Sequence, residues 1–225
     1  MSLDRRTWSV GVIGDLVGSR RSPSRVELQR EMIAALARAD EIAPGSEALA
    51  PTLGDEFQGR YADLATALTA VLVVQLVLGA DRVRFGLGIG DLLLHDPAAT
   101  PLRQDGPVWW AARAAIEAVE CATPRWGTRV RQWDAQTGAA SGAAGDGPAA
   151  VVPWANALVL GRDHHVGRLR ARDRRIALAL LAGDHQIAIS AREGISPSAV
   201  SQRVRSTGLR ALRDQIEVLR TGVVP

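Results

Sequence analysis

Short apolar runs alternate with segments of helical spacing over residues 8–134. In residues 26–40, apolar side chains recur three or four positions apart, at Leu28, Met32, Ala35 and Ala39, which predicts one buried helix face. We expect strands at residues 8–15, 48–61, 83–94 and 126–133, and helices at 26–40, 62–79 and 106–122. Because residues 48–61 fold back about a Gly-Asp-Glu turn, the order is β-α-β-β-α-β-α-β, typical of a ferredoxin-like α/β sandwich.

Several residues mark the expected ends of these elements. Ser22 or Ser24 is a suitable N-cap for the first helix, Gly79 a suitable end for the second, and Pro107 suits the first turn of the third. Residues 83–94 carry regularly spaced glycines, and we interpret them as one strand or a pair of strands.

Residues 135–151 are rich in glycine and alanine and show no periodicity. This composition predicts a flexible segment, either a loop inserted before the next helix or a linker between two domains. We therefore divide the chain into an α/β domain (1–134), this segment (135–151) and a helical domain (152–225).

The region after residue 151 has helical patterns only. We expect a helix over 154–169, a second capped by Asp173 and ending at Gly183, and a third that Asp184 opens and that runs to residue 193. Ser196 followed by Pro197 is a strong helix start, and an amphipathic helix follows Gly208.

Charge is distributed unevenly. The chain contains no lysine; residues 162–225 hold 12 arginines and 6 acidic residues, whereas residues 1–161 hold 15 arginines and 18 acidic residues. This asymmetry indicates a basic module attached to a mildly acidic one. The single cysteine, Cys121, excludes a disulfide framework and a cysteine-based zinc site, and no apolar run predicts a membrane span or secretory signal, so we expect a cytoplasmic protein.

Residues 186–205 have the layout of a helix-turn-helix, with Ala188 expected at the close contact between the helices and Gly194 at the turn. Its second helix would present polar side chains that can pair with bases or phosphates of duplex DNA: Ser196, Ser198, Ser201, Gln202, Arg203 and Arg205. The "GIS-x-x-x-VS-x-R" pattern resembles the helix-turn-helix of sigma-region-4 and LuxR-like regulators. The alternative is a small helical bundle that its arginines keep soluble.

Two aspartates lie at strand ends. Asp15 ends the first strand, and Asp55 lies at the hairpin tip, which a ferredoxin-like sheet places beside that strand. Paired carboxylates suit Mg²⁺ or Mn²⁺ bound together with substrate phosphates, and Gly14, Gly18 and Gly54 would let backbone amides approach a phosphate. The alternative is that each Gly-Asp pair only forms a turn.

Four blocks, VIGDLVGSR, TLGDEFQGRY, VRFGLGIGDL and DGPVWWAARAAI, resemble in this order the SatD family of bacterial proteins over residues 8–122. They are also similar to the class III nucleotide cyclase domain and, more remotely, to the GGDEF domain. The cyclase resemblance implies metal binding by Asp15 and Asp55 and stabilisation of phosphate charge by Arg113. It also implies nucleotide contacts by Gly14, Leu16, Gly18, Gly54, Glu56 and Trp109. Trp109 stands where cyclases have a ribose-positioning asparagine, and the base-reading lysine is absent. Both departures weaken the alignment of the nucleotide 3′-hydroxyl for in-line attack.

The resulting hypothesis is a regulator in which a cyclase-like domain binds a metal–nucleotide and a helix-turn-helix tail binds duplex DNA. The resemblance further implies a homodimer in which Arg113 acts in trans on a nucleoside triphosphate. One alternative is an active Mg²⁺- or Mn²⁺-dependent nucleotide cyclase or related phosphoryl-transfer enzyme. Another is a domain without ligand that serves only as a scaffold.

Overall fold

A twisted six-stranded sheet forms the middle of the protein. The computed structural model describes residues 8–96, 103–135, 137–143 and 150–221. The strand order is β2-β3-β1-β4-β7-β8; β4 and β7 are parallel, and the other neighbours are antiparallel. The strands are β1 (Trp8–Leu16), β2 (Glu47–Pro51), β3 (Glu56–Tyr61), β4 (Val83–Asp91), β7 (Gly127–Asp134) and β8 (Ala139–Ser141).

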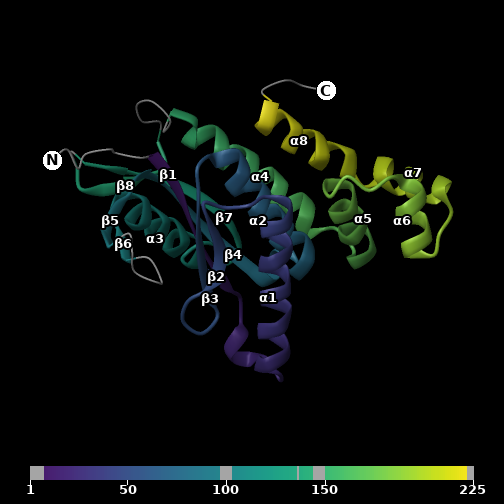
Figure 1. Cartoon of the computed structure of the whole chain (residues 1–225), viewed down its shortest axis with the longest axis horizontal. Helices are drawn as coiled ribbons and strands as arrows, with labels where there is room; N and C mark the ends of the chain where they lie inside the picture. Colours follow the sequence, from purple (N-terminus) through teal and green to yellow (C-terminus); the bar gives the residue numbers. More distant parts are fainter. Residues whose placement is uncertain (1–7, 97–102, 136, 144–149, 222–225) are drawn as a thin grey trace.

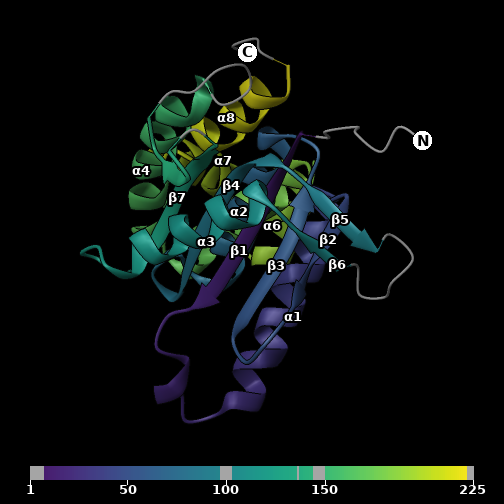
Figure 2. The ribbon, with the colours of Figure 1, turned by 90° about the vertical axis from the view of Figure 1, so that its left-hand side faces the viewer.

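A separate two-stranded sheet pairs β5 (Leu93–Asp96) with β6 (Arg103–Asp105) and projects from the body (Figure 2). The glycine-spaced segment 83–94 is thus split: β4 lies in the main sheet and β5 begins after Leu92. The order of β1 to β4 confirms the ferredoxin-like arrangement, which β7 and β8 extend.

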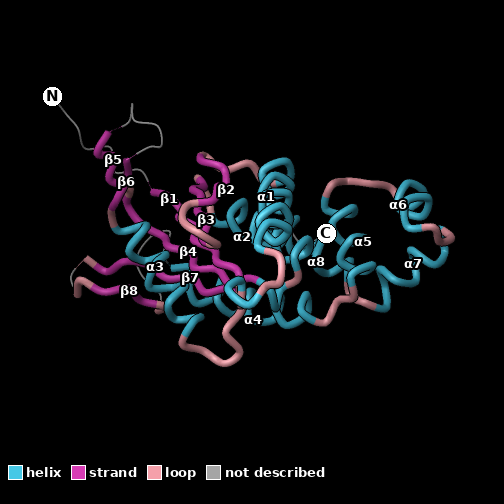
Figure 3. Tube along the Cα trace, turned by 90° about the horizontal axis from the view of Figure 1, so that it is seen from below, coloured by secondary structure: helices cyan, strands magenta, loops and turns pink. Residues whose placement is uncertain are grey.

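Helices cover both faces of the main sheet (Figures 1 and 3). One face carries α1 (Arg25–Ile42), α2 (Leu64–Leu78) and α4 (Val152–Gly167), and the other carries α3 (Pro107–Glu120). Two single turns, η1 (Ser19–Arg21) and η2 (Ala80–Arg82), follow β1 and α2. On the first face, alternate strand residues such as Val12, Phe57 and Leu87 pack against the helices in the main hydrophobic core.

Glycines on β4 explain how closely α3 approaches the sheet. A Cβ atom on Gly88 would lie 2.0 Å from the backbone oxygen of Val108, and one on Gly86 would lie 2.3 Å from that of Ala112. Because side chains alternate along a strand, every second residue of β4 faces α3, and Gly86, Gly88 and Gly90 fall on that face. The spacing of these glycines therefore fixes the depth at which α3 lies.

The apolar helix α2 is buried almost along its whole length. Its inner face contacts the sheet, whereas Leu72 and Leu76 on its outer face belong to a second core formed with the C-terminal helices. These are α5 (Ala171–Leu181), α6 (Gln186–Glu193), α7 (Pro197–Ser206) and α8 (Leu209–Thr221), on the side of α2 away from the sheet (Figure 1). A helix that is hydrophobic all round needs such cover. Within the described part of the chain, no helix combines the length and apolarity that crossing a membrane requires.

Most of the expected helix ends are confirmed. The hydroxyl of Ser24 caps α1, Gly79 follows the end of α2, and Pro107 is the first residue of α3, as expected. Two expected starts are wrong: α5 begins at Ala171, so Asp173 lies within its first turn, and α6 begins at Gln186, after His185 rather than at Asp184. Asp173 is buried and pairs with an arginine of α7, which explains a carboxylate inside the helix rather than at its cap.

The segment 135–151 is only partly irregular. Residues 139–141 form β8, which pairs with the end of β7, while residues 136 and 144–149 lie outside the described residues. The helix that follows, α4, contributes Val152, Ala155 and Val159 to the main core. The first helix of the expected helical domain therefore packs as part of the α/β layers.

Candidate functional site

Asp15 lies near the end of β1, on the α3 side of the sheet. Its cross-strand partners are Glu56 on β3 and Arg84 on β4. The Asp15 carboxylate accepts a hydrogen bond from the Arg84 guanidinium, which also pairs with Glu120 of α3 at 2.6 Å. Three strands and α3 thus bring four charged side chains together at one end of the sheet.

The Asp15 carboxyl is destabilised as an anion. Burial is the largest cause, the nearby Asp55 carboxylate adds to it, and Arg84 opposes both; together they raise the pKa of Asp15 from 3.8 to about 6. The structure therefore brings Asp15 and Asp55 together, as expected. Two such carboxylates repel each other unless a proton or cation joins them.

Asp55 is held by the loop that follows β1. It accepts a hydrogen bond from the Ser19 hydroxyl of η1. Gly18 and Gly54 flank this contact, both with positive φ, 72° and 70°, which favours glycine. A small cavity of about 30 Å³ lies here, lined by Leu16, Ser19 and Asp55 among others, together with Arg25 at the start of α1.

Arg113 projects from α3 to the same end of the sheet. Its guanidinium makes two hydrogen bonds to the Glu56 carboxylate, of 2.7 and 2.8 Å, and this pairing raises the pKa of Arg113. Glu56 lies directly opposite Asp15 on the neighbouring strand. The structure thus brings Arg113 and Glu56 beside the two aspartates, within one chain.

Three expected nucleotide contacts also take part in packing within the protein. Gly14 faces the ring of Phe57, which a Cβ atom would approach to 2.3 Å, so close packing explains this glycine. The Leu16 side chain is buried in the main core. Trp109 packs against Gly11, four residues and roughly 13 Å along β1 from Asp15.

Sequence reasoning did not assign roles to Ser19, Arg84 and Glu120. Arg84 could have been found from its register, because it lies opposite Asp15 once β1 and β4 pair. Glu120 follows Arg113 by seven residues, two helical turns along the same face of α3.

The carboxylates offer an incomplete metal site by themselves. In the described ranges, no cluster of three or more histidine, cysteine, aspartate or glutamate residues is arranged to hold a metal ion. Asp15 and Asp55 together provide the one or two carboxylates with which proteins commonly hold Mg²⁺, which takes its other ligands from phosphates and water.

A second candidate surface lies on α7. Ser196 is its N-cap and accepts a hydrogen bond from the amide of Ala199, at 3.2 Å. Ser198, Gln202 and Arg205 follow at intervals of four and three residues and are exposed, so they share one face of the helix. The opposite face carries Val200, which is buried in the second core.

The remaining two candidates on α7 are engaged within the protein. Ser201 donates a hydrogen bond of 2.6 Å to Gln186 of α6, and Arg203 pairs with Asp173 of α5 at 3.0 Å. The expectation for Ala188 is wrong, because Ala188 is exposed. Ser190 is the small residue that α6 buries, next to Ile189 of the second core.

The fold is weakly similar to solved nucleotide cyclase structures, over part of the chain. A bacterial light-regulated adenylyl cyclase has a TM-score of 0.42 and 12% identity, covering 56% of this chain and 77% of its own. The catalytic core of a rhodopsin-guanylyl cyclase with converted specificity, in complex with ATPalphaS, has a TM-score of 0.41 and 14% identity over 56% and 78%. The guanylate cyclase domain of RhGC from Catenaria anguillulae, in complex with GTP, has a TM-score of 0.39 and 15% identity, covering 57% of this chain and 80% of its own. Likeness at this level establishes no shared activity.

No curated protein matches the chain. A family model does match, over residues 9–129, which include all but the first residue of β1, the β2–β3 hairpin, β4 and α3, and with them the charged residues around Asp15. This match confirms the resemblance carried by the four sequence blocks: the chain belongs to the SatD family.

Proposed function

We propose that the chain is a DNA-binding transcriptional regulator in which α6 and α7 form a helix-turn-helix. The observation that carries this proposal is the exposed face of Ser198, Gln202 and Arg205 on α7, with Ser196 at its N-terminal end. In helix-turn-helix proteins the second helix enters the major groove with its N-terminal residues against the base edges. Glutamine pairs with adenine and arginine with guanine, and serine can bind phosphate.

The charge of the helical region supports the same proposal. Residues 162–225 carry twice as many arginines as acidic residues, 12 against 6. Part of this charge is neutralised internally, as in the Arg175–Glu193 pair at 2.7 Å, but Arg205 is exposed. A basic surface beside a groove-reading helix is the electrostatic requirement for binding duplex DNA.

The proposal is tested by selecting duplexes from a random pool with the full chain. Fluorescence anisotropy then measures the affinity for the selected duplex over a range of salt concentrations. Gln202→Ala should weaken binding to the selected duplex by about 1–3 kcal/mol, or roughly 5- to 150-fold in affinity, and relax the sequence preference at one base pair. Gln29→Ala, an exposed glutamine of α1, is the matched control and should bind as wild type does. Failure to enrich any duplex, or equal affinities of the two variants, would contradict the proposal.

We further propose that Asp15 and Asp55 bind Mg²⁺ or Mn²⁺ together with a nucleotide. The support is their mutual proximity and the raised pKa of Asp15, because a bound cation relieves the repulsion between them. Calorimetry with Mn²⁺ and each of ATP, GTP, CTP and UTP tests this proposal. At least one nucleotide should bind wild type, and its affinity for Asp55→Asn should be at least tenfold lower. Asp81→Asn, at an exposed aspartate of η2, is the matched control.

A homodimer belongs to this proposal, because paired helix-turn-helix units read DNA half-sites related by a twofold axis. Arg113 is bound by Glu56 of its own chain, so trans action requires this pair to open. Sedimentation of the full chain with the selected duplex should give two chains per duplex, and one chain per duplex would contradict the dimer.

The second candidate function is an active nucleotide cyclase or related phosphoryl-transfer enzyme. The observation that favours it is the position of Arg113 beside Glu56, opposite Asp15, where a guanidinium could stabilise phosphate charge. Trp109, which stands where cyclases have the ribose-positioning asparagine, packs against Gly11 of β1. If the protein converts a nucleoside triphosphate in the presence of Mn²⁺ and Arg113→Ala does not, the enzymatic function is established. If a nucleotide binds without conversion, the regulator remains the favoured function.

A further inference from the structure

A groove lies between the junction of α4 with α5 and the junction of α7 with α8. Its volume is about 530 Å³, within the range of roughly 300–1,000 Å³ typical of small-molecule sites. Arg168 and Arg170 line one wall, and Arg203, Thr207 and Gly208 line the other. It is separate from the Asp15–Asp55 site, which lies at the end of the main sheet.

The charge of this groove is strongly positive. Three arginines line it against one carboxylate, Asp173, whose side chain is only 3% exposed. Asp173 already accepts two hydrogen bonds from Arg203, of 3.0 and 3.2 Å. Arg168 and Arg170 are exposed, and their guanidinium groups have no hydrogen-bond or ion-pair partner among the residues that the structure describes.

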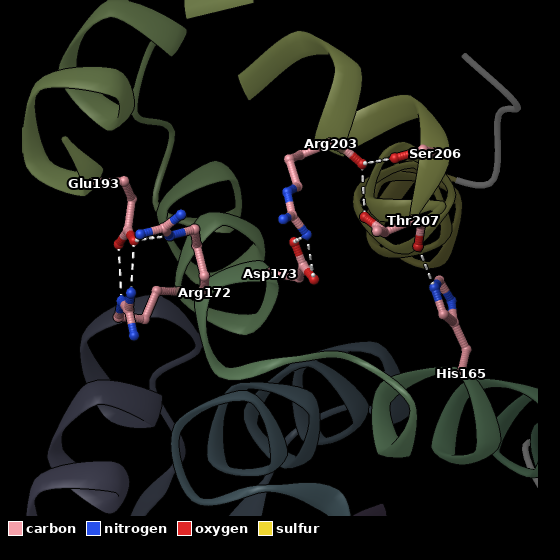
Figure 4. A network of polar contacts seen from close by, with 8 residues as sticks. His165, Arg172, Asp173, Glu193, Arg203, Ser206 and Thr207 are labelled. Atoms are coloured by element: carbon pink, nitrogen blue, oxygen red, sulfur yellow. Dashed lines mark hydrogen bonds and ion pairs between the residues drawn. The ribbon is translucent and has the colours of Figure 1, made fainter. Parts of the chain in front are cut away.

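Both walls are held in place by polar contacts across the groove (Figure 4). His165 of α4 lies with Nε2 2.6 Å from the backbone oxygen of Thr207, and Arg203 of α7 reaches Asp173 of α5. Gly208, at φ +69°, brings the chain against the imidazole, where a Cβ atom would lie 3.0 Å from the ring. The two walls of the groove are therefore preformed, held together by these contacts.

The N-terminus of α5 adds to the positive potential of one wall. The helix begins directly after Arg170, and no side-chain hydrogen bond caps it. Free backbone amides at a helix start favour bound anions, although the buried carboxylate of Asp173 occupies part of this first turn.

We infer that this groove binds a small phosphorylated ligand, such as a metabolite with a di- or triphosphate group. Guanidinium groups match phosphate oxygens with paired hydrogen bonds, and in a chain without lysine they are its only long cationic side chains. The groove lies at the C-terminal end of α7, about 15 Å from the Ser196 end for a helix of 10 residues. A ligand here would join α4 and α5 to α7 and α8. The inference does not depend on DNA binding.

Calorimetry of the full chain with sodium tripolyphosphate in EDTA tests this inference, because EDTA keeps the metal-dependent Asp15–Asp55 site silent. The variant Arg168→Ala/Arg170→Ala should bind tripolyphosphate at least tenfold more weakly than wild type. Arg30→Ala/Arg213→Ala removes the same charge from exposed arginines outside the groove and should stay within twofold of wild type. Absence of binding to wild type, or equal losses in the two double variants, would overturn the inference.

Two further arms distinguish the source of the phosphate. ATP in EDTA should bind with the same dependence on Arg168 and Arg170 if the ligand is a soluble polyphosphate. If wild type ignores tripolyphosphate and ATP while duplex DNA binding falls tenfold in the groove variant, these arginines contact DNA and the inference is overturned. Because both side chains are exposed, we expect the variant to fold, and Arg168→Gln/Arg170→Gln repeats the test with smaller loss of contact area.

Discussion

Replacing Asp15 with asparagine should stabilise the protein without ligand while removing one of the two proposed metal ligands. Folding places the Asp15 carboxyl where burial and Asp55 raise its pKa from 3.8 to about 6. At about 1.4 kcal/mol for each pKa unit, this rise corresponds to at most about 3 kcal/mol of destabilisation when the group is ionised. Solvent screens part of this effect, so we expect about 1–2 kcal/mol. Arg84 is not left alone by the change, because Glu120 pairs with it at 2.6 Å.

The gain should depend on pH with a definite sign. Below about pH 4 the carboxyl is protonated in both the folded and unfolded chain, so asparagine and aspartic acid differ little. Between about pH 4 and 6 the unfolded chain loses this proton before the folded chain does, and the folded state loses stability as the pH rises. Above pH 6 the penalty is complete, and the advantage of Asp15→Asn should be constant.

Urea unfolding of wild type and Asp15→Asn at several pH values from 4.5 to 8 measures this difference, with Asp81→Asn as the charge control. The free energy of unfolding of Asp15→Asn should exceed that of wild type by about 1–2 kcal/mol at pH 8 and by less at pH 4.5. A variant less stable than wild type at pH 8, or a difference that does not change with pH, would refute the reasoning.

Two further predictions concern packing and a buried charge. Gly88→Ala would place a Cβ atom 2.0 Å from the backbone of α3 and should lower the free energy of unfolding in urea by about 3 kcal/mol. Gly90→Ala, whose nearest contact is at 3.1 Å, should lower it by about 1 kcal/mol. Equal losses would contradict the close approach of α3. Arg203→Ala leaves the buried Asp173 carboxylate unpaired and should cost about 2–3 kcal/mol, since Arg203 itself is partly exposed. Arg210→Ala, which breaks an exposed pair, should cost less than about 0.5 kcal/mol, and a similar loss in both would argue against a structural role for Arg203.

The alternation of strands and helices in the first 134 residues was predictable because most of these elements bury one face, either in the main core or, for α3, in a smaller cluster on the other side of the sheet. Apolar strand residues such as Val12 and Leu87 fall on the main-core face at every second position of their strands, and α1 buries Met32 and Ala39 along one stripe. Asp15 and Asp55 could also be paired from sequence, because the hairpin must lie beside β1 in a ferredoxin-like sheet.

Other features depend on contacts that no local pattern records. The apolar run of α2 gives no preferred face, so the covering of Leu72 and Leu76 by the C-terminal helices could not be read from it. Gly14 fits phosphate binding and ring packing equally well in sequence, and only the position of Phe57 decides between them. Arg203 likewise matches a DNA-contacting residue until Asp173 is found opposite it.

The affinity of the full chain for its selected duplex, measured with and without Mn²⁺ and the nucleotide that binds, tests the account most directly. A regulator with a metal–nucleotide sensor should show at least a fivefold difference between the two conditions, the lower limit of common allosteric coupling. Asp55→Asn should bind the duplex equally in both conditions. Equal affinities in wild type, or no duplex bound in either condition, would contradict the account.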